Sequence, residues 1–148
     1  MTVTTNVISS GDLYRRAEEA ARRASQNVMT ELFGAMQQSF TAKAWEWPRE
    51  TLRGGGVVVG SPRNLIDTAN LRQSGSFQMV APYLAKMQWS ASYAAPVHEG
   101  AWIRPWGNQN AERVYLPARP WTRAVLGLER VNGIEPFPLG ERLRDVWL

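Results

Sequence analysis

The residues best suited to chemistry are His98 and Glu99, which are neighbours and include the chain's single histidine. Such a pair can in principle supply a general base. Adjacent side chains point apart in regular structure, however, and no cysteine or nucleophile-elbow motif accompanies them. A metal site would need ligands from Asp67, Glu112 or elsewhere, at no recognisable spacing. We therefore expect His98 to be a hydrogen-bonded turn residue before Gly100, and we predict no enzyme activity, cofactor or metal.

Other chemical motifs are incomplete. Ser74-Gly75-Ser76 lacks the G-x-S-x-G frame of a nucleophile elbow, and no acidic pair has a spacing that suggests glycoside hydrolysis. The triplet Gly54-Gly55-Gly56 runs into Val57-Val58-Val59, a strand signal, whereas a phosphate-binding loop opens a helix and carries a lysine. A small hydrolase that uses His98 and Glu99 remains an alternative that loss of activity in His98→Ala would test.

Charge and composition restrict the partners. The chain has 148 residues, 17 Lys and Arg against 13 Asp and Glu, and a net charge of +4. The basic excess is spread evenly along the chain, which argues against a dedicated nucleic-acid surface. Cysteine is absent, which excludes disulfides and Cys-based metal sites. No apolar run reaches the roughly 18 to 20 residues of a membrane span, and the start lacks a basic segment followed by a hydrophobic stretch, so we expect synthesis in a cytoplasm and no membrane association.

An apolar stripe near the N-terminus predicts one helix from residue 11 to residue 42. Its members recur in steps of three and four: Leu13, Ala17, Ala20, Ala21, Ala24, Val28, Leu32, Met36 and Phe40. Ser9 or Ser10 is expected to cap the first turn, where Asp12 suits the positive end of the helix dipole. The alanine-rich first half allows close approach by a partner element. Pro48 and the glycine triplet after it indicate a linker or loop.

The middle of the chain predicts short elements. After the Val57–Val59 strand, Asp67 or Thr68 is expected to cap a short helix that carries Leu71 and ends before Gly75. Period-two alternation from Phe77 to Ala91, interrupted at 81–83, predicts an antiparallel hairpin.

The remaining elements are predicted more coarsely. Residues 93–100 indicate a turn or a single helical turn stopped by Gly100, and residues 101–114 a long surface loop. Val114–Leu116 indicates a further strand. Pro120 is placed to begin a helix from Trp121 to Leu128 that buries both of these residues together with Ala124 and Val125.

The length fits one domain over residues 1–148. We divide it into an N-terminal arm, the long helix, a core and an extended C-terminal tail in which residues 141–148 form a possible short helix. The bounds of these four parts are 1–10, 11–42, 57–128 and 129–148.

Three blocks in the chain resemble the neck and tail-completion proteins of tailed bacteriophages, a group that includes proteins similar to minor tail protein Z of phage lambda. The blocks are Asp67-Thr68-Ala69-Asn70-Leu71-Arg72-Gln73-Ser74, Tyr93-Ala94-Ala95-Pro96-Val97-His98-Glu99-Gly100 and Ala118-Arg119-Pro120-Trp121. They occur in the order of the family pattern, over about residues 62 to 128. Ala69 stands where glycine is common, and Trp121 where phenylalanine is usual.

The resemblance implies an α+β subunit in which a long N-terminal helix packs on a small, mostly antiparallel sheet, with a second helix after Pro120. It further implies a structural virion protein that forms a ring, with six subunits expected from the six-fold tail, at the head-proximal end of the tail. Its partners would be itself, the tail tube protein, the head-tail connector or stopper protein and, in a contractile tail, the sheath protein. Packaged DNA would only pass through the lumen. Tail terminator, joining protein and minor tail protein remain alternatives.

Seven tryptophans suit a protein that makes interfaces, because tryptophan is favoured in the buried centres of such contacts. Our candidates for interface residues are Trp102, Trp106, Phe137 and Trp147. Our candidates for residues facing a DNA-filled lumen are Arg63, Arg72 and Arg104. The alternative class is a small DNA-binding protein, although a helix-turn-helix would need two short helices rather than one long amphipathic helix.

Overall fold

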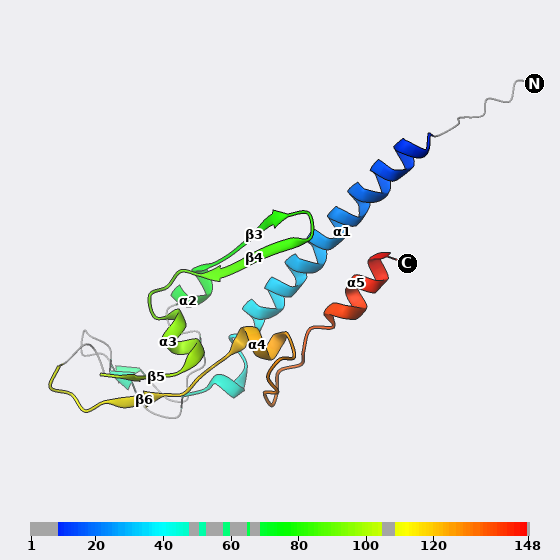
Figure 1. The fold of residues 1–148 in the computed structure, drawn as a ribbon. Helices are drawn as coiled ribbons and strands as arrows, with labels where there is room; N and C mark the ends of the chain where they lie inside the picture. Colours follow the sequence, from blue (N-terminus) through cyan, green and yellow to red (C-terminus); the bar gives the residue numbers. More distant parts are fainter. Residues whose placement is uncertain are drawn as a thin grey trace, which may run out of the picture.

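A computed structural model describes residues 9–47, 51–52, 58–59, 65, 69–104 and 109–147. Figure 1 shows the arrangement of its helices and strands. In chain order these are α1 (Ser10–Ser39), the 3-10 helix η1 (Lys43–Trp45), β1 (Thr51–Leu52), β2 (Val58–Val59), α2 (Asn70–Gln73), β3 (Gly75–Ala81), β4 (Leu84–Trp89), α3 (Ala94–Glu99), β5 (Ala101–Ile103), β6 (Val114–Leu116), α4 (Trp121–Val125) and α5 (Leu139–Trp147). The α+β class is confirmed. The strands among the described residues form three separate two-stranded antiparallel sheets rather than one small sheet.

Helix α1 forms where the apolar stripe predicts it, and ends at Ser39 rather than residue 42. The Ser9 hydroxyl caps it by accepting a hydrogen bond from the Asp12 backbone N–H at 3.1 Å. Only the second half of the stripe is covered: the first buried residue is Ala21, whereas Leu13 is 54% exposed and Tyr14 80% exposed. The first third of α1 therefore extends past the rest of the fold (Figure 1). No described helix has the length and apolarity needed to cross a membrane.

The β3–β4 hairpin follows the period-two prediction. Phe77 pairs with Met87, and the odd-numbered residues of both strands except Ala81 are half-buried toward α1, while the even-numbered ones, such as Gln78, face solvent. The Phe33 ring of α1 lies 6.1 Å from the Phe77 ring and 5.6 Å from the Trp89 ring. These contacts hold the hairpin against the second half of α1.

The predicted long loop 101–114 is wrong at its start, because Ala101–Ile103 forms strand β5 and pairs with β6. Gly100 causes this turn: its φ of +79° sends the chain from α3 back beside Leu116. Strand β1 is a second element that was read as linker. Three-residue and two-residue strands are too short to show an alternating pattern.

The C-terminal third differs from the predicted helix and extended tail. Helix α4 ends at Val125, because Gly127 adopts a φ of +71°, and Leu128 is 73% exposed rather than buried. Residues 129–138 then lead back to the core, where the Phe137 backbone N–H donates to the Val125 carbonyl at 2.7 Å. The short helix predicted within the tail is present as α5, which begins at Leu139 and packs against α1.

The core lies between the second half of α1, the hairpin and α4. Its largest fully buried side chains are Phe40 and Trp121, whose rings meet edge-on at 5.2 Å. Trp89 adds a second edge-on contact to Trp121 at 5.6 Å. The aromatic cluster joins elements that are far apart in the sequence.

Candidate functional site

Each of the three sequence blocks that carry the phage resemblance contributes a buried side chain to the same core cluster. Leu71 from the first block, Ala94 from the second and Trp121 from the third are all buried members of the same core cluster. The Arg119 backbone N–H donates to the Val97 carbonyl at 3.0 Å, which ties the third block to the second. The blocks therefore act together in packing.

The first block contains a left-handed backbone conformation. Ala69 precedes α2 with a φ of +62°, the left-handed region that glycine adopts without strain. This is the position at which the resembled pattern commonly has glycine. The predicted capping by Asp67 or Thr68 is wrong, since Ala69 is the N-cap and makes no side-chain cap hydrogen bond. Asp67 and Thr68 themselves lie outside the described residues.

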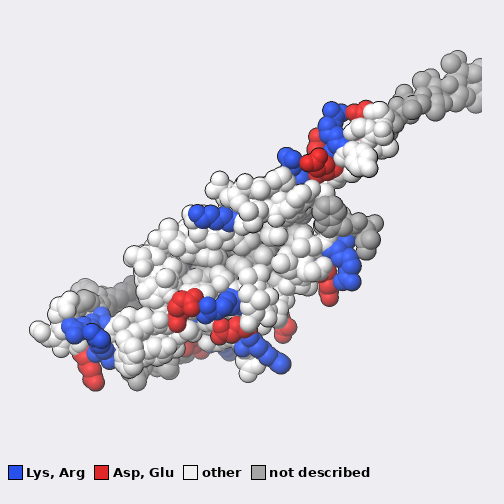
Figure 2. All heavy atoms as spheres, viewed as in Figure 1, with Lys and Arg blue, Asp and Glu red and all other residues white. Residues whose placement is uncertain are grey.

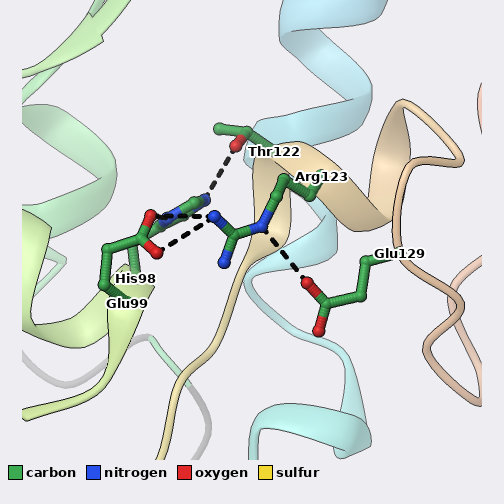
Figure 3. A network of polar contacts seen from close by, with 5 residues as sticks. All are labelled: His98, Glu99, Thr122, Arg123 and Glu129. Atoms are coloured by element: carbon green, nitrogen blue, oxygen red, sulfur yellow. Dashed lines mark hydrogen bonds and ion pairs between the residues drawn. The ribbon is translucent and has the colours of Figure 1, made fainter.

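A polar network connects α3 with α4 (Figure 3). His98 Nδ1 lies 2.5 Å from Glu99 Oε1, and His98 Nε2 lies 2.7 Å from the Thr122 hydroxyl. Both Glu99 oxygens accept from Arg123 Nη1, at 3.0 and 3.1 Å, and Arg123 Nε donates to Glu129 at 3.2 Å. The expectation that His98 and Glu99 point apart is wrong, because Glu99 is the last residue of α3 and its side chain turns back beside the ring.

The network has a clear electrostatic effect. The hydrogen bond with His98, and next the hydrogen bond with Arg123, lower the pKa of Glu99 below its usual value of 4.5. Glu99 in turn raises the pKa of Arg123. Glu99 is therefore ionised at neutral pH, and its two partners hold it in place.

The contacts of this network link helix α3 to helix α4. A carboxylate, an imidazole and a hydroxyl in series also occur in nucleophile relays. Here Arg123 occupies both carboxylate oxygens of Glu99, while the imidazole stands edge-on against Trp121 at 4.6 Å. Each partner thus restrains α3 against α4. Among the described residues, no group of three or more His, Asp or Glu side chains is placed to hold a metal ion.

The predicted interface residues fall in different environments. Trp102 is 66% exposed on β5 and packs its ring 5.4 Å from the Tyr115 ring of β6. Phe137 is half-buried against the core. Trp106 and the side chain of Trp147 lie outside the described residues. Tyr115 is an exposed aromatic residue that is not among the predicted interface residues. It is identified by the pairing of β5 with β6, which places it opposite Trp102.

The two lumen candidates that the structure describes, Arg72 and Arg104, lie in different segments of the fold. Arg72 is exposed on α2, and its carbonyl accepts from Gln37 Nε2 at 3.1 Å. Arg104 follows β5 and donates to the Gln109 side chain at 2.9 Å, within the β5–β6 connection. Arg63 lies outside the described residues. On the face drawn in Figure 2, basic and acidic side chains alternate along the exposed part of α1, and the broad surface beside it is largely uncharged.

Comparison with models of protein families, with curated proteins and with solved structures finds no match to the chain.

Proposed function

We propose that this protein is a structural subunit of a tailed-bacteriophage neck, and that it forms a ring which completes or terminates the tail and joins it to the head connector. The observation that carries the proposal is that the three resembling blocks share one core. Leu71, Ala94 and Trp121 pack in one core, and Ala69 has the left-handed backbone that the pattern's glycine would have. If the pattern of a family reflects packing, its residues are expected to share one core, as these three do.

The surfaces left uncovered support an assembled state. The β5–β6 hairpin exposes Trp102 and Tyr115, and the opposite end of the molecule exposes the first third of α1 (Figure 1). A ring needs a heterologous contact, in which two different surfaces of one subunit meet its two neighbours. Exposed aromatic side chains suit the centre of such an interface. Two separated surfaces are what this geometry requires.

The proposed partners follow from the position in the virion. The ring would contact the tail tube protein on one side and the connector or stopper protein on the other, with the sheath protein as a further neighbour in a contractile tail. DNA would pass through the lumen, for which Arg72 and Arg104 are the described candidates. Assembly would take place in the host cytoplasm before the protein becomes part of the virion neck.

Negative-stain electron microscopy of the purified protein tests the proposal. We expect closed rings with a central opening. Compact dimers that bind duplex DNA, with an affinity that falls steeply as salt rises, would overturn the proposal and favour the DNA-binding alternative.

A substitution in the hairpin tests the proposed contact surface. Trp102→Ser should reduce the fraction of ring particles while leaving the monomer folded, because the side chain is mostly exposed. Leu128→Ser is the matched control, since Leu128 is similarly exposed but lies outside the hairpin. Equal ring fractions for the two variants would remove the hairpin from the proposed interface.

A further inference from the structure

The β3–β4 hairpin has open edges. Within the described part of the chain β3 pairs only with β4, so each strand presents one row of backbone N–H and C=O groups without a strand partner. Such an edge is a template for a further strand. One face of the sheet packs toward α1 through Phe77 and Met79, and the other presents the polar residues Ser76 and Gln78. A third strand at this edge needs apolar and polar residues in alternation.

The segment before α1 follows that pattern from Val3 to Val7, with Thr5 at the middle position of the apolar face. Residues 2–8 read Thr-Val-Thr-Thr-Asn-Val-Ile, of which all but Asn6 are β-branched. β-branched residues favour the extended conformation. Val3, Thr5 and Val7 would share one face of a strand, and Thr2, Thr4, Asn6 and Ile8 the other. The segment has seven residues, the same number as β3.

The chain's own β3 is out of reach for most of this segment. β3 runs back along α1, since Gly75 lies beside Gln37 and Ala81 lies beside Arg22 and Gln26. Ser10 stands twelve residues before Arg22, about 18 Å along the helix at roughly 1.5 Å per residue. An extended chain covers about 3.3 Å per residue, so five or six residues would be needed to span this distance back to the nearest end of β3. Only about two residues of segment 2–8 would remain to pair with it.

We propose that residues 2–8 of one copy add to the free edge of β3 in a second copy as a third strand. Val3, Thr5 and Val7 then continue the face that carries Phe77 and Met79, while Thr4 lies on the solvent side with Gln78. The projecting third of α1 carries the segment across to the neighbouring copy. This contact rests on the self-association in the proposed function and assigns it to particular elements.

Cross-linking between copies is the direct test. Because the natural chain has no cysteine, a sample of Thr4→Cys can be mixed with a sample of Gln78→Cys and treated with a short bismaleimide. We expect a heterodimer of twice the chain mass in which the two substituted peptides are joined. A mixture of Thr4→Cys with Asn132→Cys is the control, because Asn132 is also exposed but lies between α4 and α5, outside the hairpin. The control should give a much lower yield, and equal yields for the two acceptors would overturn the proposal.

The period of the contact gives a second test. Thr5→Lys places a charge on the packed face, whereas Thr4→Lys makes the same change one residue earlier on the solvent face. We expect self-association of Thr5→Lys to be at least about tenfold weaker than that of Thr4→Lys, measured by sedimentation. Equal association constants would contradict a strand in this position.

The two proposals fail in different ways. The contact between residues 2–8 of one copy and β3 of another is called the arm contact. If rings persist unchanged in both lysine variants and give no specific cross-link, the arm contact is overturned but the proposed ring is not. A specific cross-link in open chains or dimers would support the arm contact and overturn the closed ring. A sample that neither associates nor cross-links would contradict both.

Discussion

Gly100→Ala is the substitution whose cost follows most directly from the geometry. Gly100 lies between α3 and β5 with a φ of +79° and a ψ of 148°, a region used almost only by glycine. A methyl group added there would stand 2.9 Å from the Ala118 backbone nitrogen and 3.1 Å from the Leu116 carbonyl oxygen. Both neighbours are backbone atoms, so neither can move aside by changing a rotamer.

The magnitude has two parts. The backbone conformation costs about 1–3 kcal/mol for a residue other than glycine. The contacts add about 1–3 kcal/mol, the usual cost of forcing an extra methyl group into packed structure. We therefore expect Gly100→Ala to lower the free energy of unfolding by about 2–6 kcal/mol, a large share of the 5–15 kcal/mol that a typical domain has.

Gly133→Ala is the matched control, because Gly133 also has a positive φ, +81°, but nothing lies within 4 Å of the added methyl group. It should lose only about 1–2 kcal/mol. Urea unfolding followed by tryptophan fluorescence measures both variants. A loss in Gly100→Ala no greater than that in Gly133→Ala would refute the argument from contacts.

Three further predictions concern the core, the polar network and α1. Trp121→Ala should lower the free energy of unfolding by about 3–5 kcal/mol in urea, because Trp121 is only 2% exposed, and a loss under about 1 kcal/mol would contradict its place at the core. Glu99→Gln should flatten the dependence of the unfolding free energy on pH. Because the pKa of Glu99 is lowered in the folded state, its contribution to stability is present above pH 4.5 and is lost as the pH falls through the folded-state pKa. Plots of unfolding free energy against pH that run parallel for the variant and the wild type would contradict this prediction. Gly34→Ala should raise the thermal midpoint by a stabilisation of about 0.5–1 kcal/mol, because Gly34 is inside α1 with open space around it, and a lower midpoint would show a hidden contact.

The regular elements of the fold could be predicted because their patterns are local. The three- and four-residue spacing of Val28, Leu32 and Met36 identifies the buried face of α1, and alternation identifies the β3–β4 hairpin. The same spacing continues to Leu13 and Ala17, which are not buried. Periodicity identifies an apolar face, but it does not tell which part of that face another element covers.

The candidate site depended on distant contacts that spacing does not reveal. Glu99 meets Arg123 from 24 positions away, and the left-handed turn at Gly100 determines where β5 lies. Leu128 was predicted as buried because it continues the spacing of Trp121 and Val125, but the positive φ of Gly127 turns the chain away first. In each case the deciding factor is backbone geometry at an element's end or a long-range partner.

Self-assembly into a closed ring is the central claim, and native mass spectrometry tests it most directly. Six copies of a 16.6 kDa chain weigh about 100 kDa, with the count of six taken from the symmetry of tails. We predict a discrete species near that mass at micromolar concentration. A single species of 16.6 kDa over the whole concentration range, or a dimer that does not grow further, would contradict the ring.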